Sequence, residues 1–126
     1  MPRTAVVPRS LVANSNLIGS TGSTTIDATL VTNGVVVENT IPERILIRVT
    51  NTEGTTNTVT VAAGDNPPAM SQGLGALVVT VAATTGVQYI GPFESGRFMQ
   101  DSGDLHIDFE TGMTGAIDIL LIPRNT

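Results

Sequence analysis

Short runs in which aliphatic residues alternate with polar ones constrain the fold most. In residues 44–51, RILIRVTN, the residues Ile45, Ile47 and Val49 fall on one face. Alternation with period two is typical of a strand that buries one face, and no segment sustains a helical period. Turn-forming Gly, Pro and Asn interrupt such runs at intervals of roughly 8–12 residues, which predicts about eight or nine short strands. We therefore expect an all-β fold, either an antiparallel β-sandwich or a jelly-roll-like barrel.

Residues 104–123 show the strongest signal for a strand pair. They read DLHIDFE, TGMTG and AIDILLIP, which are two alternating runs joined by the short segment 111–115. This arrangement predicts a β-hairpin. A symmetrical register gives one wholly apolar face, which we expect to be core: Leu105 opposite Leu121, Ile107 opposite Ile119 and Phe109 opposite Ile117. The second face pairs Asp108 with Asp118 and His106 with Leu120.

The length of 126 residues suits one domain with one core. Aromatic residues make up only 3% of the chain, so the core must be aliphatic, and the absence of Cys excludes disulfides. We expect residues 1–126 to form a single β domain. Residues 1–33 are predicted to be an extended N-terminal arm or a long loop, because Pro8 suits only an edge strand and residues 14–34 are thinly apolar. Residues 34–126 are predicted to form the compact β core.

The net charge of −5 and the lack of Lys argue against nucleic acid as the main partner. No stretch approaches the roughly 20 apolar residues that span a bilayer, so no membrane role is expected.

Chemistry-bearing residues are sparse. Asp104, His106, Asp108 and Asp118 fall on one predicted face, which leaves three interpretations open: a calcium-like site, an arginine clamp, or a solvated outer surface. A single His without Cys is weak support for a metal, and nucleophile and nucleotide-binding motifs are absent. We therefore predict no catalytic residues, metal or cofactor, and no enzymatic activity.

Three segments would leave apolar side chains exposed on an isolated monomer, which is rare for contiguous patches. They are the predicted arm, the proline-containing loop at 65–70 and the second hairpin face. We predict that they form interfaces with other chains of an assembly. The candidate residues are Arg3, Arg9, Leu11, Pro67, Pro68, Met70, Leu120 and Ile122.

Residues 44–124 and the opening PRTAV resemble the small β-rich decoration, or cement, proteins of tailed bacteriophage heads. The resemblance lies in the order of NPPA at 66–69, IGPFES at 90–95, MTG at 113–115 and PR at 123–124. It implies a structural virion protein on the outer surface of the capsid that bridges neighbouring major capsid proteins. It also implies self-association, as a trimer, and synthesis in the host cytoplasm.

Two other functions fit the same composition. One is a carbohydrate-binding or adhesin-type β-sandwich module, although few aromatic residues are available for a sugar platform. The other is a structural protein of the tail or of the head–tail junction.

Overall fold

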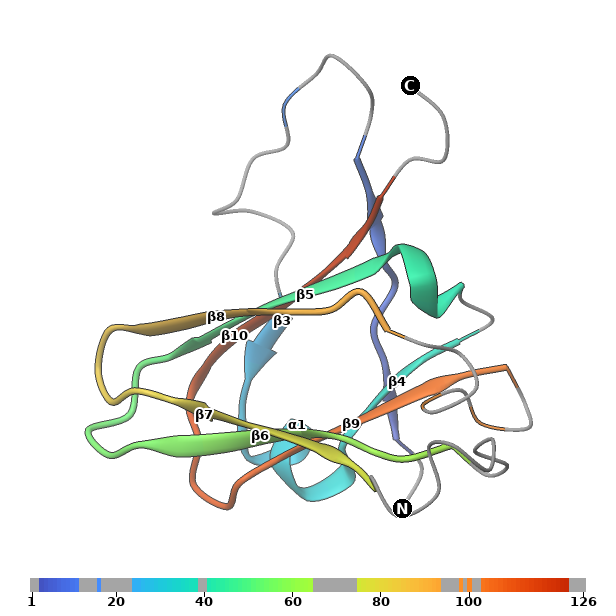
Figure 1. Cartoon of the computed structure of the whole chain (residues 1–126). Coiled ribbons are helices and arrows are strands. Elements are labelled where there is room, and N and C mark those ends of the chain that lie inside the picture. The colour runs from blue at the N-terminus through green and yellow to red at the C-terminus, as the bar shows by residue number, and fades with distance from the viewer. Residues whose placement is uncertain are drawn as a thin grey trace.

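A computed structural model describes residues 3–11, 16, 24–38, 41–64, 75–93, 98, 100 and 103–122. In this part of the chain two mixed β-sheets pack face to face and do not close into a barrel (Figure 1). The expected all-β sandwich is thus confirmed. Sheet A has the strand order β1-β4-β9-β6-β7, and sheet B has the order β2-β10-β5-β8, with β3 paired to β10.

Sheet A consists of β1 (Thr4–Ala5), β4 (Val35–Val37), β9 (Leu105–Phe109), β6 (Asn57–Val61) and β7 (Leu77–Val81). Sheet B consists of β2 (Arg9–Ser10), β10 (Gly115–Leu121), β5 (Ile45–Asn51) and β8 (Gly86–Ile90), together with β3 (Thr24–Ile26). The described helices are α1 (Ala28–Asn33) and the 3-10 helix η1 (Pro42–Arg44).

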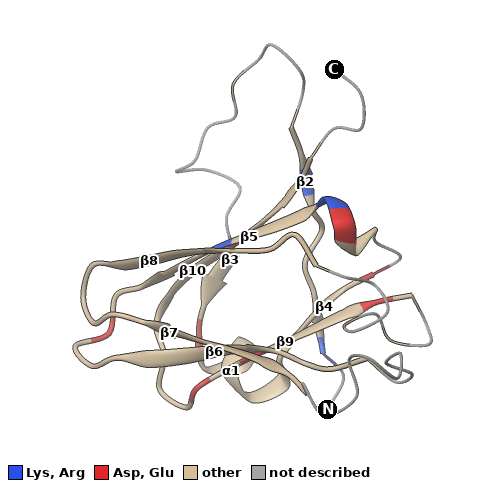
Figure 2. Cartoon of the chain, in the orientation of Figure 1, with Lys and Arg blue, Asp and Glu red and all other residues tan. Residues whose placement is uncertain are grey.

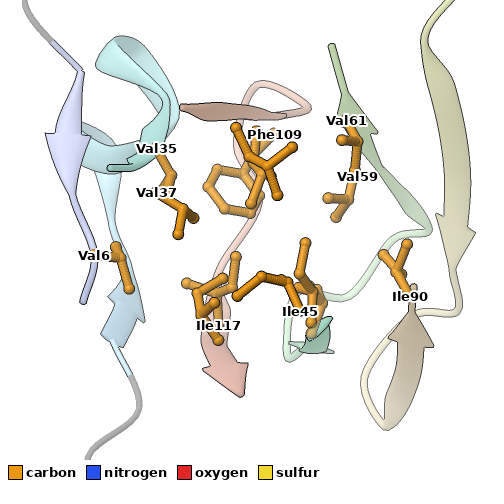
Figure 3. Close-up of a cluster of buried hydrophobic side chains, with 14 of the residues drawn as sticks. Val6, Val35, Val37, Ile45, Val59, Val61, Ile90, Phe109 and Ile117 are labelled. Carbon is orange, nitrogen blue, oxygen red and sulfur yellow. The ribbon is translucent and has the colours of Figure 1, made fainter. Parts of the chain in front are cut away.

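The core lies between the two sheets and is almost wholly aliphatic, as predicted. Figure 3 shows Val35, Val59 and Phe109 of sheet A pointing toward Ile45 and Ile117 of sheet B. The alternating runs of β5 and β6 bury every second residue, so the period-two pattern correctly identified the inward faces.

The predicted arm is part of the sandwich. Residues 3–11, called the strap below, pair in parallel with β4 through β1 and with β10 through β2 (Figure 1). Val6 lies between the two pairings with 7% of its surface exposed, and its N–H donates to the Val36 carbonyl at 3.0 Å. The strap therefore passes from one sheet to the other and covers one side of the core.

The hairpin prediction for residues 104–123 was wrong. β9 pairs with β4 and β6 in sheet A, whereas β10 pairs with β2, β3 and β5 in sheet B. Positive φ angles at Gly112 (90°) and Gly115 (139°) turn the chain, and Met113 is buried at the turn. The strands thus face each other across the core, and Leu105, Ile107 and Ile119 are buried from opposite sides.

The α1 helix was not expected from the sequence. Asp27 caps its first turn by accepting a hydrogen bond from the Leu30 N–H at 2.8 Å, and Leu30 is buried. Gly34, with a φ of 78°, ends the helix and leads directly into β4. Two cap residues and one buried Leu are therefore enough to form this helix. It is too short for a helical period to be visible in the sequence.

Candidate interaction surface

The outer faces of the two sheets differ in chemistry. The outer face of sheet A is rich in hydroxyl and charged groups, because Thr58 and Thr60 of β6 alternate with buried valines and Thr60 stands opposite Asp108. His106 lies on the same face, opposite Val36. Val36 and the 59% exposed Val78, opposite Thr60, lie among these polar groups on the same face.

The outer face of sheet B combines apolar side chains with two arginines, Arg48 on β5 and Arg9 on β2. The cross-strand register places Leu46 opposite Leu120, and Arg48 opposite both Asp118 and Tyr89. Tyr89 is 62% exposed and Val87, its neighbour on the same face, is 40% exposed. The sheet B outer face is defined by Arg9, Thr25, Leu46, Arg48, Thr50, Val87, Tyr89, Ala116, Asp118 and Leu120.

Two Arg–Asp pairs hold the strap to the two sheets. Arg3 donates to Asp108 at 2.7 and 3.3 Å and to the Ile107 carbonyl at 3.2 Å. Arg9 binds Asp118 through Nε at 2.9 Å and through a second nitrogen. The Asp118 side chain is only 3% exposed, and its hydrogen bond raises the pKa of Arg9 despite partial desolvation. This forked geometry is the strong form of a carboxylate–guanidinium contact.

Of the three interpretations of the acidic cluster, the arginine clamp fits Asp108 and Asp118. The two carboxylates belong to different sheets, and each is bound by its own strap arginine. Among the described residues no three His, Asp or Glu side chains gather as a metal-binding group.

Arg48 is left for other contacts. Within the described part of the chain its guanidinium makes no ion pair or hydrogen bond, since Asp118 opposite it is bound by Arg9. Arg and Tyr are enriched at the energetic centres of protein interfaces. Arg48 and Tyr89 therefore form the centre of the candidate interaction surface.

A buried amide cluster fixes the neighbouring turns. Asn51, at the end of β5, donates to the carbonyls of Val81 and Ala82 at 3.3 and 3.2 Å. Asn57 donates to Glu53 at 2.6 Å. The hydrogen bonds from Asn57 and, next, Thr55 lower the pKa of Glu53. These contacts tie the β5–β6 turn to the end of β7, where the chain crosses to β8.

The sequence-predicted interface residues fall into three groups. Arg3 and Arg9 use their side chains within the chain, as described above. Leu120 is half-buried on the sheet B outer face, and Leu11 and Ile122 are half-buried beside it. The Leu11 N–H donates to the Leu121 carbonyl, and the Ile122 N–H donates to the Arg44 carbonyl. Pro67, Pro68 and Met70 lie outside the described residues.

The structure adds Arg48, Tyr89 and Val87 as surface candidates that the sequence reasoning missed. A signal was present, because Arg48 is the only charged residue of β5 and Tyr89 is the chain's single Tyr. The alternation in 44–51 indicated which face Arg48 occupies, but not that Tyr89 stands beside it.

A hollow of about 220 Å³ lies between α1 and the turn after β9, lined by Val31, Met113 and neighbouring Thr and small residues. It is smaller than the roughly 300–1,000 Å³ of typical small-molecule sites. Neither described helix is long enough to cross a bilayer.

Comparisons with protein-family models, curated proteins and solved structures found no match.

Proposed function

We propose that this protein is a structural virion component that binds the outer surface of a phage capsid and bridges neighbouring capsid subunits. The proposal starts from the resemblance to decoration proteins in residues 44–124. It is supported by one structural observation, the position of Arg48 beside the exposed Tyr89 and Val87 on the outer face of sheet B.

In this proposal the sheet B outer face lies against the shell. Leu46, Leu120 and Val87 supply apolar area, and Tyr89 and Arg48 supply the contacts that dominate interface energies. The Arg48 guanidinium is suited to a carboxylate on the capsid protein, which it can bind through two parallel hydrogen bonds.

Stabilisation of the shell then follows from mass action. A protein that binds the assembled lattice and not its separated subunits shifts the equilibrium toward the lattice by the free energy of its binding. No catalytic step is required. Self-association would join several such contacts and raise the avidity.

Co-sedimentation with shells that lack this protein tests the proposal. The shells should be assembled from the major capsid protein that is the proposed partner. Wild-type protein should sediment with them, and Arg48→Ala should bind about tenfold more weakly or worse, as expected at an interface centre. Thr80→Ala, an exposed change on the outer face of sheet A, is the matched control and should bind normally. Absence of wild-type binding would contradict the proposal.

Carbohydrate binding is the second candidate, because the exposed Tyr89 ring beside Arg48 offers one aromatic platform for a sugar. A glycan array separates the two functions. Specific glycan binding that is lost in Tyr89→Ser, together with no binding to shells, would favour the carbohydrate-binding role.

A further inference from the structure

The two sides of the sandwich are closed in different ways. On one side the edge strands β1 and β2 are two residues long, and Pro8 and the Arg3 and Arg9 ion pairs lie on or beside them. Short strands, prolines and charges are the usual protection of a sheet edge. On the other side β7 and β8 are five residues each and contain neither a charge nor a proline (Figure 2).

The hydrogen-bonding pattern of sheet B shows which backbone groups of β8 do not bond to β5. The Thr52 N–H donates to the Thr114 carbonyl at 3.0 Å, so even-numbered residues of β5 bond to β10. Odd-numbered residues therefore bond to β8, opposite its even-numbered residues. The backbone N–H and C=O groups of Val87 and Tyr89 consequently point away from β5, toward an edge at which none of the described strands pairs.

We propose that β8 pairs with β8 of a second copy of this chain, antiparallel, about a two-fold axis through Gln88. In that register Val87 stands opposite Tyr89 of the partner subunit, and each such pair exchanges both of its backbone hydrogen bonds. The pairing is self-complementary, as an isologous interface must be. An aromatic residue opposite a β-branched one is also a favourable cross-strand pair.

The absence of charged residues on β8 favours a second copy at this edge. Two copies with a net charge of −5 repel each other, but Gly86–Ile90 is uncharged, so no like charges meet along the paired strands. On β6 the Ala62 N–H donates to the His106 carbonyl of β9, so the odd-numbered residues of β6 bond to β7. The equivalent edge of β7 therefore presents the backbone groups of Val78 and Thr80. It offers no aromatic pair.

The dimer would join two copies of sheet B into one continuous sheet. Two sheet B outer faces would then lie side by side, an arrangement suited to contacting two neighbouring subunits of a lattice. The inference rests on the edge geometry and not on the proposed function, and it predicts a two-fold dimer where the resemblance implies a trimer.

Light scattering on the purified protein over a concentration series tests the assembly. The mass of the wild-type protein should rise toward twice the chain mass of 13.1 kDa. Tyr89→Lys should raise the dissociation constant at least tenfold, whereas Val78→Lys, at the similarly exposed β7 edge (59%), should leave it unchanged. A wild-type mass that stays at one chain or reaches three, or equal effects of the two variants, would overturn the proposal.

Crosslinking gives an independent test that does not depend on weakening the dimer. Gln88 of the two copies would form a pair without backbone hydrogen bonds, with Cα atoms about 4.5 Å apart, within the roughly 4.4–6.8 Å that a disulfide spans. Because the chain has no Cys, Gln88→Cys should oxidise to a single covalent dimer. Thr80→Cys, exposed on β7, should remain monomeric. Equally fast crosslinking of both variants would contradict pairing through β8.

Discussion

Replacing Val6 by Ala probes whether the strap is docked in the free protein. Val6 is 7% exposed and lies in the core between the two parallel pairings, whereas its neighbour Val7 is 81% exposed. Val→Ala removes two methyl groups, each worth about 0.8 kcal/mol when buried. Adding a small cavity term gives a loss of about 2 kcal/mol for Val6→Ala. Val7→Ala should change the free energy of unfolding by less than about 0.5 kcal/mol.

Urea denaturation of the two variants measures both values in one experiment. Because a domain of this kind is stable by only about 5–15 kcal/mol, a loss of about 2 kcal/mol shifts the midpoint clearly. The slope of the free energy of unfolding against urea concentration should stay the same in both variants. If Val6→Ala were as mild as Val7→Ala, the strap would not be packed on its own sheets, and the reasoning about the closed side of the sandwich would fail.

Three further predictions concern the contacts that hold the fold. Arg9→Met should lower the thermal midpoint more than Arg3→Met, because the carboxylate partner of Arg9 is almost fully buried; equal shifts would contradict this. The lowered pKa of Glu53 means that its stabilising effect is complete above about pH 4.5 and is lost as the pH falls through the folded-state pKa, so Glu53→Gln should reduce the acid sensitivity of the midpoint. An unchanged pH profile would count against the amide cluster. Gly115→Ala should cost several kcal/mol or abolish folding, since the added Cβ would overlap a backbone oxygen of β5 and φ is positive, whereas Gly54→Ala, in open space, should be tolerated; a stable Gly115→Ala protein would contradict the tight approach of β10 to β5.

The strands and the inward faces could be predicted from the sequence because they depend on local alternation. Ile45, Ile47 and Val49 are all buried, as the period-two pattern required. The burial of Phe109 and Ile117 was also predicted correctly, although their strands are not paired. Alternation identifies which side of a strand is apolar but does not identify the neighbouring strand.

The arrangement of the strands depends on long-range contacts that local patterns do not encode. A hairpin and a crossing between two sheets need the same apolar alternation, so the pattern at 104–123 fits both, and the different pairing partners of β9 and β10 distinguish them. The docking of the strap was likewise not predictable, because an edge strand such as Thr4–Ala5 can add to its own sheet or to another chain with the same hydrogen bonds.

The candidate surface was only partly predictable for the same reason. Leu120 was placed on an outer face by alternation, but the sequence could not show that Arg9 binds a carboxylate of its own chain while Arg48 binds none among the described residues. Which arginine is available to a partner depends on residues that are far apart in sequence, such as Arg9 and Asp118.

Under the proposed function, the position and orientation of the protein on a capsid test the central claim most directly. Electron cryo-microscopy of the particle should show the domain on the outside of the capsid, across a boundary between capsid subunits, with Arg48 and Tyr89 against the shell. A domain in the tail, or one on the capsid with the outer face of sheet B turned to solvent, would contradict the account.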